Sequence, residues 1–277
     1  MGYIDLHTHS TCSDGTDTPE ELIKKAKNIG LSAISLTDHD SFEGIEEALS
    51  AGEKYGIEVI KGAELSSSEN GVRFHILGYF FNDSGTELSE YFEMKNKFRH
   101  ERVKKICEKL NALGINLKYE DVVPEGKKIS PCRANVAKAL ADRKFVTDVP
   151  EAFNKYLLKG TPAYVPGMKI TPAEAVRLIM ENGGKPYLAH LNQINLSDNE
   201  LSDCLAELKS KGLEGIEGYY SEYSFDQTEK YIGYAKELEL KISGGSDYHG
   251  GVKPAISLGT GKGNLKIPYS VLEKIKD

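Results

Sequence analysis

The chain lacks the features of a membrane protein, a secreted protein or a thiolate metal protein. No apolar run in its 277 residues is long enough to span a bilayer. The first residues lead straight into a strand, without the basic and apolar regions of a secretory signal. Cysteines are few and far apart, and no two form a Cys-x-x-Cys pair: Cys12, Cys107, Cys132 and Cys204. This usage predicts a cytoplasmic protein, without disulfides and without membrane contact.

Positive charge is also scarce, since 35 lysines and arginines face 42 acidic residues and the net charge is -7. A protein that holds long nucleic acid is usually basic. An acidic protein can still bind phosphate where metal ions supply the positive charge. The balance therefore favours a small phosphorylated substrate, or short nucleic acid, as the partner. Nothing in the sequence indicates an obligate protein partner.

The most informative stretch is Ile4–Gly15, an apolar strand that ends in a polar loop. His7 and His9 are two residues apart, so both point to one face of a strand. Asp14 follows on a loop that Gly15 allows to turn sharply. Two imidazoles and a nearby carboxylate are the beginning of a metal site.

The first sixty residues alternate between strands and helices, which predicts an α/β fold with parallel strands. Capping boxes begin the helices expected at 19–29 and 171–182. Further helices are expected at 42–55, 198–211 and 225–238. Seven strands are expected, beginning near Ile4 and continuing at 31–36, 57–63, 72–80, 186–189, 213–217 and 240–243.

The third and fourth strands break this alternation, because Asn70-Gly71 is a strong hairpin signal. The turn predicts antiparallel pairing, with Ser66 opposite His75. Glu64 would then share a face with His75.

The middle of the chain has few strand signals. Helices are expected at 88–113, 133–141 and 151–158. We therefore predict a barrel unit formed by residues 1–84 and 167–277, interrupted by a helical insertion at 85–166.

Polar residues that suit metal binding follow the apolar strands one after another. Six of the seven histidines lie at such strand ends, and only His100 does not. In barrels, catalytic side chains gather at the carboxyl ends of strands. The candidate ligands are His7, His9, Asp14, His39, Glu64, His75, His190, Asp247 and His249.

Imidazole and carboxylate ligands without thiolate suit manganese, iron or zinc. The candidates are too many for one ion, so two or three divalent ions are expected. A carboxylate such as Glu64 can bridge two of them.

These motifs together resemble the PHP (polymerase and histidinol phosphatase) family. The resemblance rests on His7-Thr8-His9-Ser10, Thr37-Asp38-His39-Asp40, Gly62-Ala63-Glu64, Ala189-His190 and Gly245–Gly250. It runs the length of the chain and is greatest to the stand-alone branch of nucleotide phosphatases and 5′-3′ exonucleases. The resemblance implies a distorted seven-stranded (β/α)7 barrel that holds three metal ions.

The resemblance also implies how the ligands are shared. His7, His9, Glu64 and Asp247 would hold one ion. Glu64, His75 and His190 would hold the second, and Asp14, His39 and His249 the third.

Two segments depart from the family pattern. Ala189-His190 is followed by Leu191, where relatives often have proline. The insertion has Arg133-Ala134-Asn135, where relatives often have Arg-x-His. Arg133 is therefore expected to contact phosphate, and Asn135 leaves the second contact and the substrate preference open.

The predicted function is metal-dependent hydrolysis of phosphate monoesters of nucleotides or small phosphoesters, with a metal-bridging hydroxide as nucleophile. Arg133 would stabilise charge on the phosphate, with Lys159 or Lys169 as contacts to a second phosphate. The proton donor to the leaving group stays open between a metal-bound water, Asp38 and His190. Asp38 has an alternative role in orienting a neighbouring ligand.

Three alternatives stay open at this point. The chain could be a 5′-3′ exonuclease on short RNA or DNA, a non-catalytic metal-binding module, or a histidinol phosphatase. Tyr219 and Tyr220 could stack on a base or sugar, or pack in the core.

Overall fold

The computed structural model describes residues 2–82, 85–126 and 129–277. The chain divides into two compact units, and each is described by itself. The first comprises Met1–Glu90 and Lys169–Asp277, and the second comprises Tyr91–Met168.

The first unit is built on one seven-stranded sheet, whose strands lie side by side in sequence order. The strands are β1 (Tyr3–Asp5), β2 (Leu31–Leu36), β3 (Glu58–Glu69), β4 (Val72–Tyr79), β5 (Lys185–Leu188), β6 (Gly215–Tyr220) and β7 (Lys241–Gly245). β4 runs antiparallel to β3 and β5, and all the other neighbouring pairs are parallel. The carboxyl ends of β1, β2, β3, β5, β6 and β7 therefore point the same way.

The sheet curls into a nearly closed barrel, because the first and last strands meet. The Leu6 amide donates to the Gly244 carbonyl at 3.1 Å, and the Asp247 amide donates to the His7 carbonyl at 2.8 Å. This closure brings two segments 240 residues apart into contact, and both carry candidate ligands.

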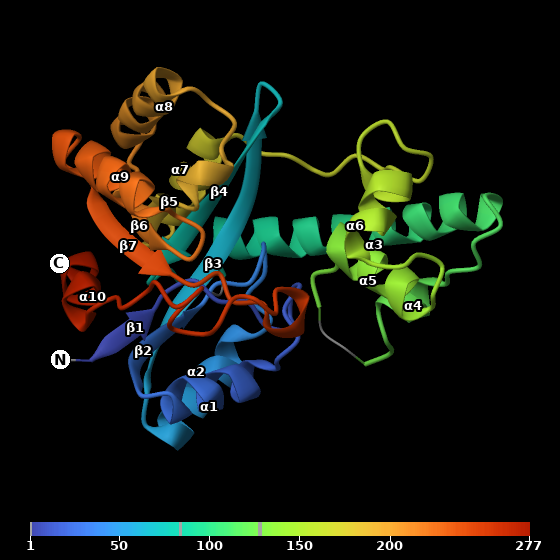
Figure 1. Cartoon of the computed structure of the whole chain (residues 1–277), viewed down its shortest axis with the longest axis horizontal. Helices are drawn as coiled ribbons and strands as arrows, with labels where there is room; N and C mark the ends of the chain where they lie inside the picture. Colours follow the sequence, from blue (N-terminus) through green and yellow to red (C-terminus); the bar gives the residue numbers. More distant parts are fainter. Residues whose placement is uncertain (1, 83–84, 127–128) are drawn as a thin grey trace. The chain divides into compact units, whose positions relative to one another are not determined.

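Six helices of the first unit cover the barrel: α1 (Pro19–Asn28), α2 (Ile45–Tyr55), α7 (Pro172–Glu181), α8 (Asp198–Ser210), α9 (Phe225–Glu237) and α10 (Tyr269–Lys276). Short 3₁₀ turns lie at η2 (Leu191–Gln193) and η3 (Gly250–Val252). Figure 1 shows α1 and α2 beside β2 and β3, and α9 beside β6 and β7. Thr18 and Thr171 form the predicted capping boxes, and Ser197 and Ser224 form two more.

The second unit is helical and has its own apolar core. Its elements are α3 (Glu87–Ala112), which begins in the first unit, then α4 (Tyr119–Val122), α5 (Arg133–Asp142), α6 (Val149–Ala152) and the π-helical turn η1 (Phe153–Leu157). Ile106, Leu110, Val136 and Leu140 are fully buried there, which shows that α3 and α5 pack through their apolar faces.

The structure confirms the α/β class, the seven strands and the antiparallel hairpin. Ser66 lies opposite His75 and Glu69 opposite Val72, as the Asn-Gly turn predicts. The helices differ from the prediction in places. The 151–158 helix is divided between α6 and η1, and α10 was missed, because Pro268 and Tyr269 follow a Gly-rich loop with no strong start signal.

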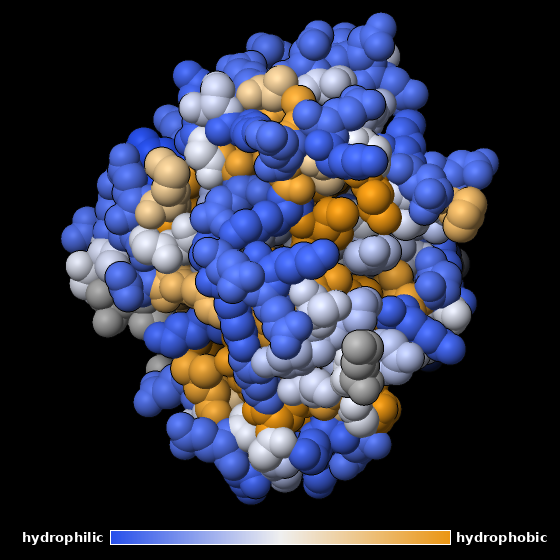
Figure 2. Space-filling model, turned by 90° about the vertical axis from the view of Figure 1, so that its left-hand side faces the viewer, coloured by the Kyte–Doolittle hydropathy of each residue, from blue (hydrophilic) through white to orange (hydrophobic). Residues whose placement is uncertain are grey.

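No helix among the described residues is long and apolar enough to cross a membrane. On the face that Figure 2 shows, apolar groups are visible at separate places between hydrophilic side chains. Isolated apolar groups are ordinary on a protein surface and indicate no binding site, whereas an apolar hollow with a defined lining can indicate one.

Gly245 makes the barrel closure possible, and its substitution tests that contact. A Cβ atom at position 245 would lie 2.4 Å from both the amide nitrogen and the Cβ of His7. We expect Gly245→Ala to lower the free energy of unfolding by about 2–3 kcal/mol, because backbone would have to shift.

Urea denaturation measures this change. Gly233→Ala is the matched control, since nothing lies within 4 Å of that position in α9. It should stabilise the protein by about 0.5–1 kcal/mol through helix propensity. Equal stability of Gly245→Ala and the wild type would contradict the proposed closure.

Candidate metal centre

Glu64, at the carboxyl side of the barrel, lies at the centre of the candidate ligands. Its Oε2 atom is 3.2 Å from His7 Nε2, 3.1 Å from His9 Nε2 and 3.2 Å from His39 Nδ1. Its Oε1 atom is 2.7 Å from His75 Nδ1 and 2.9 Å from His190 Nε2. The two oxygens of one carboxylate thus face two different groups of imidazoles.

Asp247 extends the cluster on the Oε2 side. Its Oδ1 atom is 3.6 Å from His7 Nε2, 3.3 Å from His9 Nε2 and 3.3 Å from His249 Nδ1. The strand β7 delivers this carboxylate to the end of β1 through the barrel closure.

Asp14, on the loop after β1, completes the third group. One of its oxygens is 3.4 Å from His249 Nε2, and the other is 3.9 Å from His39 Nε2. His9 Nδ1 lies 3.8 Å from Asp14. The structure therefore brings all nine predicted ligands together.

The donor set fits divalent metal ions. Three groups each offer ligand atoms within 4.8 Å of one another: His9, Asp14, His39 and His249; His7, His9 and Glu64; and His39, Glu64 and His75. Both ring nitrogens of His9 and the Nδ1 atom of His39 are buried without a hydrogen-bond partner. Buried polar atoms normally have partners, and a metal ion that displaces any proton on these nitrogens would supply one.

The charges of the cluster are balanced between carboxylates and imidazoles. Burial raises the pKa of Glu64, but the electrostatic interaction with the imidazoles around it outweighs this and holds that pKa well below its usual range. Asp247 behaves likewise: burial opposes ionisation, His7 favours it, and the pKa falls well below normal. These carboxylates are ionised at neutral pH.

The imidazoles divide into two kinds. Burial lowers the pKa of His39 to about 3, so its ring is neutral. Burial also opposes protonation of His9, but Asp247 and Glu64 outweigh it and raise its pKa to about 9. The pKa of His7 is raised well above normal, since the carboxylates of Glu217 and Glu64 overcome its burial.

Two candidate ligands have a backbone conformation that ordinary residues rarely adopt. His190 has φ of 26° and Asp247 has φ of 56°. Such geometry costs free energy and persists where the surroundings enforce it, often at functional sites.

Glu217 is a functional residue that the sequence reasoning missed. It is fully buried in the middle of β6. Its Oε1 lies 2.8 Å from His7 Nδ1, and its Oε2 accepts a 2.7 Å hydrogen bond from the His190 amide. A carboxylate can only accept, so Nδ1 of His7 carries the proton and Nε2 faces Glu64. The strand expected from the sequence at 213–217 ends on Glu217, so the rule that polar residues end the strands could have found this residue.

Lys253 and Tyr220 were also missed as neighbours of the cluster. Lys253 Nζ lies 2.6 Å from Asp247 Oδ2, and the Tyr220 hydroxyl donates to the same oxygen at 2.9 Å. They hold Oδ2 and leave Oδ1 facing the imidazoles. Tyr220 is buried, in agreement with core packing, whereas Tyr219 is only partly buried.

Asp38 is buried beside the first loop. Its carboxylate accepts hydrogen bonds from the Ser10 amide at 2.8 Å and from the hydroxyls of Ser10 and Ser13. It thereby ties the end of β2 to the segment between His9 and Asp14.

The predicted substrate contacts lie mainly in the second unit. Arg133 Nη1 donates to the Leu157 carbonyl at 2.8 Å, and Asn135 Oδ1 accepts from the Cys132 amide at 2.7 Å. Lys159 is exposed, and so is Lys169 in the first unit.

Comparisons with known proteins agree with this geometry. The PHP domain model matches residues 5–118. The chain is 32 % identical over 247 residues to a protein of Haemophilus influenzae named 5′-3′ exoribonuclease, covering 88 % of this chain and 89 % of that one. It is 31 % identical over 252 residues to a Chromobacterium violaceum protein named 3′,5′-nucleoside bisphosphate phosphatase, covering 90 % and 88 %.

Solved structures show the same fold. A Bifidobacterium adolescentis protein, provisionally assigned as a metal-dependent phosphoesterase, superposes with a TM-score of 0.86 at 28 % identity, covering 98 % of this chain and 94 % of that one. A Chromobacterium violaceum protein, described as an amidohydrolase with bound sulfate and no metal, gives 0.81 at 30 % identity, covering 89 % and 87 %.

The nearly closed barrel, the clustered imidazoles and carboxylates, and the likeness to these relatives together identify a metal-dependent phosphoesterase. The chain belongs to the PHP family, and it is a hydrolase of phosphoric esters.

The protonation of His7 and His9 predicts that metal affinity depends on pH. Both rings are doubly protonated, and therefore cationic, in the metal-free protein near neutral pH, because their pKa values are raised. A metal ion must displace these protons. Affinity for Mn²⁺ should therefore rise as pH increases towards about 9, by about tenfold per pH unit for each proton displaced.

Competition with a fluorescent chelator measures this affinity, and calorimetry in buffers of different ionisation enthalpy counts the released protons. An affinity that is constant with pH, with no proton release, would show that these imidazoles are not ligands.

Glu217→Gln tests the orienting contact. The amide cannot replace the carboxylate on His7 Nδ1 and the His190 amide together. We expect Mn²⁺ affinity to fall about 10–100-fold. Glu181→Gln is the control, because Glu181 is exposed and pairs with Arg177, away from the candidate ligands. A folded Glu217→Gln protein with unchanged metal affinity would be inconsistent with this role.

Proposed function

We propose that the protein hydrolyses phosphate monoesters of nucleotides, with nucleoside bisphosphates as the favoured substrate class. The observation that carries the proposal is the cluster of nine ligands around the buried carboxylate of Glu64. The likeness to a named nucleoside bisphosphate phosphatase over 90 % of the chain supports the substrate class.

In this proposal three divalent ions, manganese, iron or zinc, share the nine ligands. The first ion is held by His7, His9, Glu64 and Asp247, the second by Glu64, His75 and His190, and the third by Asp14, His39 and His249. When bound, such ions lower the pKa of water and neutralise charge on a phosphoryl group. The distances of both Glu64 oxygens to separate imidazole groups support a bridging role for this residue.

The protein's own side chains prepare the site for this chemistry. Glu217 sets the tautomer of His7, and Lys253 with Tyr220 fixes the orientation of Asp247. Asp38 accepts three hydrogen bonds from Ser10 and Ser13, which supports the orienting role over that of proton donor. His190 faces Glu64, which supports its role as a ligand.

Arg133 is proposed to bind a substrate phosphate, with Asn135 and Lys159 as further contacts. Arg133 lies in a positively charged part of the second unit. Burial, together with the nearby charges of Arg133 and Arg99, lowers the pKa of Arg102 to about 10. A concentration of guanidinium groups attracts and orients phosphate through bidentate hydrogen bonds.

A second candidate function is 5′-3′ exonucleolytic cleavage of short RNA. The likeness to a named 5′-3′ exoribonuclease, at 32 % identity, favours it. Both reactions hydrolyse a phosphoester, so the same metal ligands serve either one. The substrate, rather than the metal centre, separates the two.

A substrate comparison tests the proposal. Manganese-loaded protein is assayed for release of inorganic phosphate from 3′,5′-bisphosphates and 5′-monophosphates, and for release of mononucleotides from 5′-phosphorylated RNA. Phosphate release with the highest kcat/KM on bisphosphates is expected. Exclusive release of mononucleotides would favour the exonuclease, and no product at all would refute both.

Arg133→Ala extends this test to the substrate contact. Losing one charge-assisted phosphate contact should lower kcat/KM about 10–100-fold while metal content stays unchanged. Arg133→Lys should restore part of the activity, because it keeps the charge but not the bidentate geometry. Unchanged turnover in Arg133→Ala would remove this residue from the site.

A further inference from the structure

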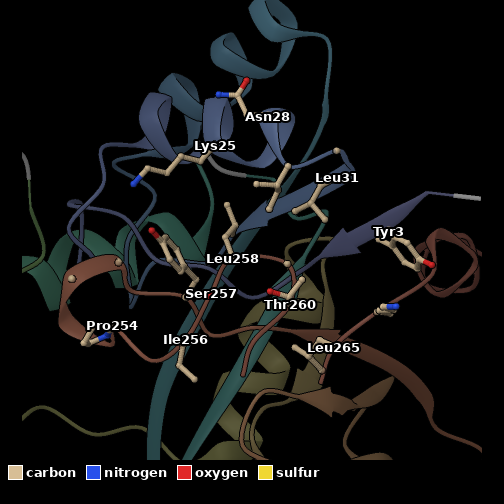
Figure 3. Close-up of a pocket in the computed structure, with 17 residues that line it drawn as sticks. Tyr3, Lys25, Asn28, Leu31, Pro254, Ile256, Ser257, Leu258, Thr260 and Leu265 are labelled. Atoms are coloured by element: carbon tan, nitrogen blue, oxygen red, sulfur yellow. The ribbon is translucent and has the colours of Figure 1, made fainter. Parts of the chain in front are cut away.

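The first unit contains a hollow whose lining includes none of the candidate metal ligands. The end of α1 and the start of β2 form one side of this hollow. The segment that follows β7 forms the other side. Its volume is about 750 Å³, within the range of pockets that hold small molecules. Figure 3 shows Lys25 and Asn28 of α1 across from Pro254, Ile256 and Leu265.

The interior of this pocket is largely apolar. Leu31, Ile256, Leu258 and Leu265 line it and are each less than a tenth exposed. Ile29, also part of the lining, is 54 % exposed. When a ligand covers an apolar side chain of that size, removal of its surface from water stabilises the complex by about 25 cal/mol per Å² of area covered.

The charged residues of the pocket are of one sign. Lys25 and Lys266 belong to its lining, and no Asp or Glu does among the described residues. Lys25 is paired with both oxygens of Asp17, at 2.7 Å each. Lys266 is exposed, and in the described part of the chain its ammonium group forms no hydrogen bond or ion pair. Its positive charge is available to a ligand.

One wall of the pocket is formed by the segment after β7 that also carries two candidate metal ligands. Tyr248 lines the pocket and stands between Asp247 and His249 in the sequence. Its carbonyl accepts from the His9 amide at 2.9 Å, and its hydroxyl donates to Asp17 at 2.8 Å.

The neighbouring residues make a second connection. Gly251 also lines the pocket, and its amide donates to the Thr16 hydroxyl at 2.8 Å. Thr16 lies two residues after Asp14. A shift of this wall would therefore move the segments that carry Asp14 and His249, two of the three ligands in the third group.

We propose that this pocket binds a soluble amphipathic anion, with an apolar body between Leu31, Ile256 and Leu265 and its anionic head at Lys266, and that its occupancy changes the metal affinity of the centre behind Tyr248. Because the pocket has an apolar interior and an unpaired cation, it favours an anionic ligand with an apolar part over a neutral or cationic ligand. The hollow shape selects a small molecule over a flat partner surface.

Decanoate is the probe, titrated calorimetrically into the manganese-loaded full-length protein. We expect one decanoate per chain. Lys266→Glu should weaken binding about fivefold, as expected for an exposed charge pair. Lys274→Glu changes the net charge equally at an exposed position outside the pocket, so it should leave binding unchanged.

Thr260→Trp tests the location independently of charge. Thr260 is exposed and lines the pocket, so the indole ring can fill the space without disturbing the core. Decanoate binding should be lost in this variant. Absence of binding to the wild type, or equal binding by all variants, would overturn the proposed site.

The coupling is tested by repeating the titration after removal of metal. The decanoate affinity should differ between the two states by about fivefold, and Mn²⁺ affinity should change by the same factor when decanoate is present, because binding linkage is reciprocal. Equal affinities would overturn the coupling. Neither measurement uses catalysis, so failure here is distinct from failure of the proposed enzymatic function.

Discussion

The structure depends on keeping the carboxylates of Glu64, Asp247 and Asp14 ionised among six imidazoles at one end of the barrel. Glu64 is the centre of this arrangement, since its two oxygens contact five histidines. Burial alone would neutralise such a carboxylate. The surrounding imidazoles prevent this and hold its pKa well below normal. The same balance of charge that lets the protein fold also prepares the cluster for divalent cations, which can replace the protons on His7 and His9.

The barrel makes this cluster possible because it gathers the ends of strands that are distant in sequence. Two buried aspartates fasten the segments concerned. Asp5 accepts hydrogen bonds from the amides of Ser246 and Gly259, at 2.8 Å each, and so ties β1 to the segment after β7. Asp38 does the same for β2 and the loop after β1, through Ser10 and Ser13. Neither carboxylate is among the candidate ligands, yet both determine where the ligands lie.

The two units carry different kinds of side chains. The barrel unit contains the cluster of imidazoles and carboxylates, and the helical unit contains cationic side chains around Arg133. The apolar pocket beside α1 adds a third element, because Tyr248 contributes to its wall and lies between two ligand positions. Only Glu64 and His75 of the nine candidate ligands lie within strands, and the others lie on the segments that follow strand ends, which the barrel holds in place.

The sequence by itself determined the residue types of the centre and placed most of them just after a strand, because His-x-His, the Asn70-Gly71 turn and the strand–helix alternation act over short distances. Glu64 and His75 instead lie within β3 and β4. The tertiary structure alone decided what surrounds them. Glu217 and Lys253 are ordinary charged residues in the sequence, and only the barrel closure brings them to His7 and Asp247. The pocket beside α1 was equally invisible, since its walls come from segments more than 200 residues apart. Local patterns specify local geometry, whereas contacts between distant segments exist only after the chain has closed on itself.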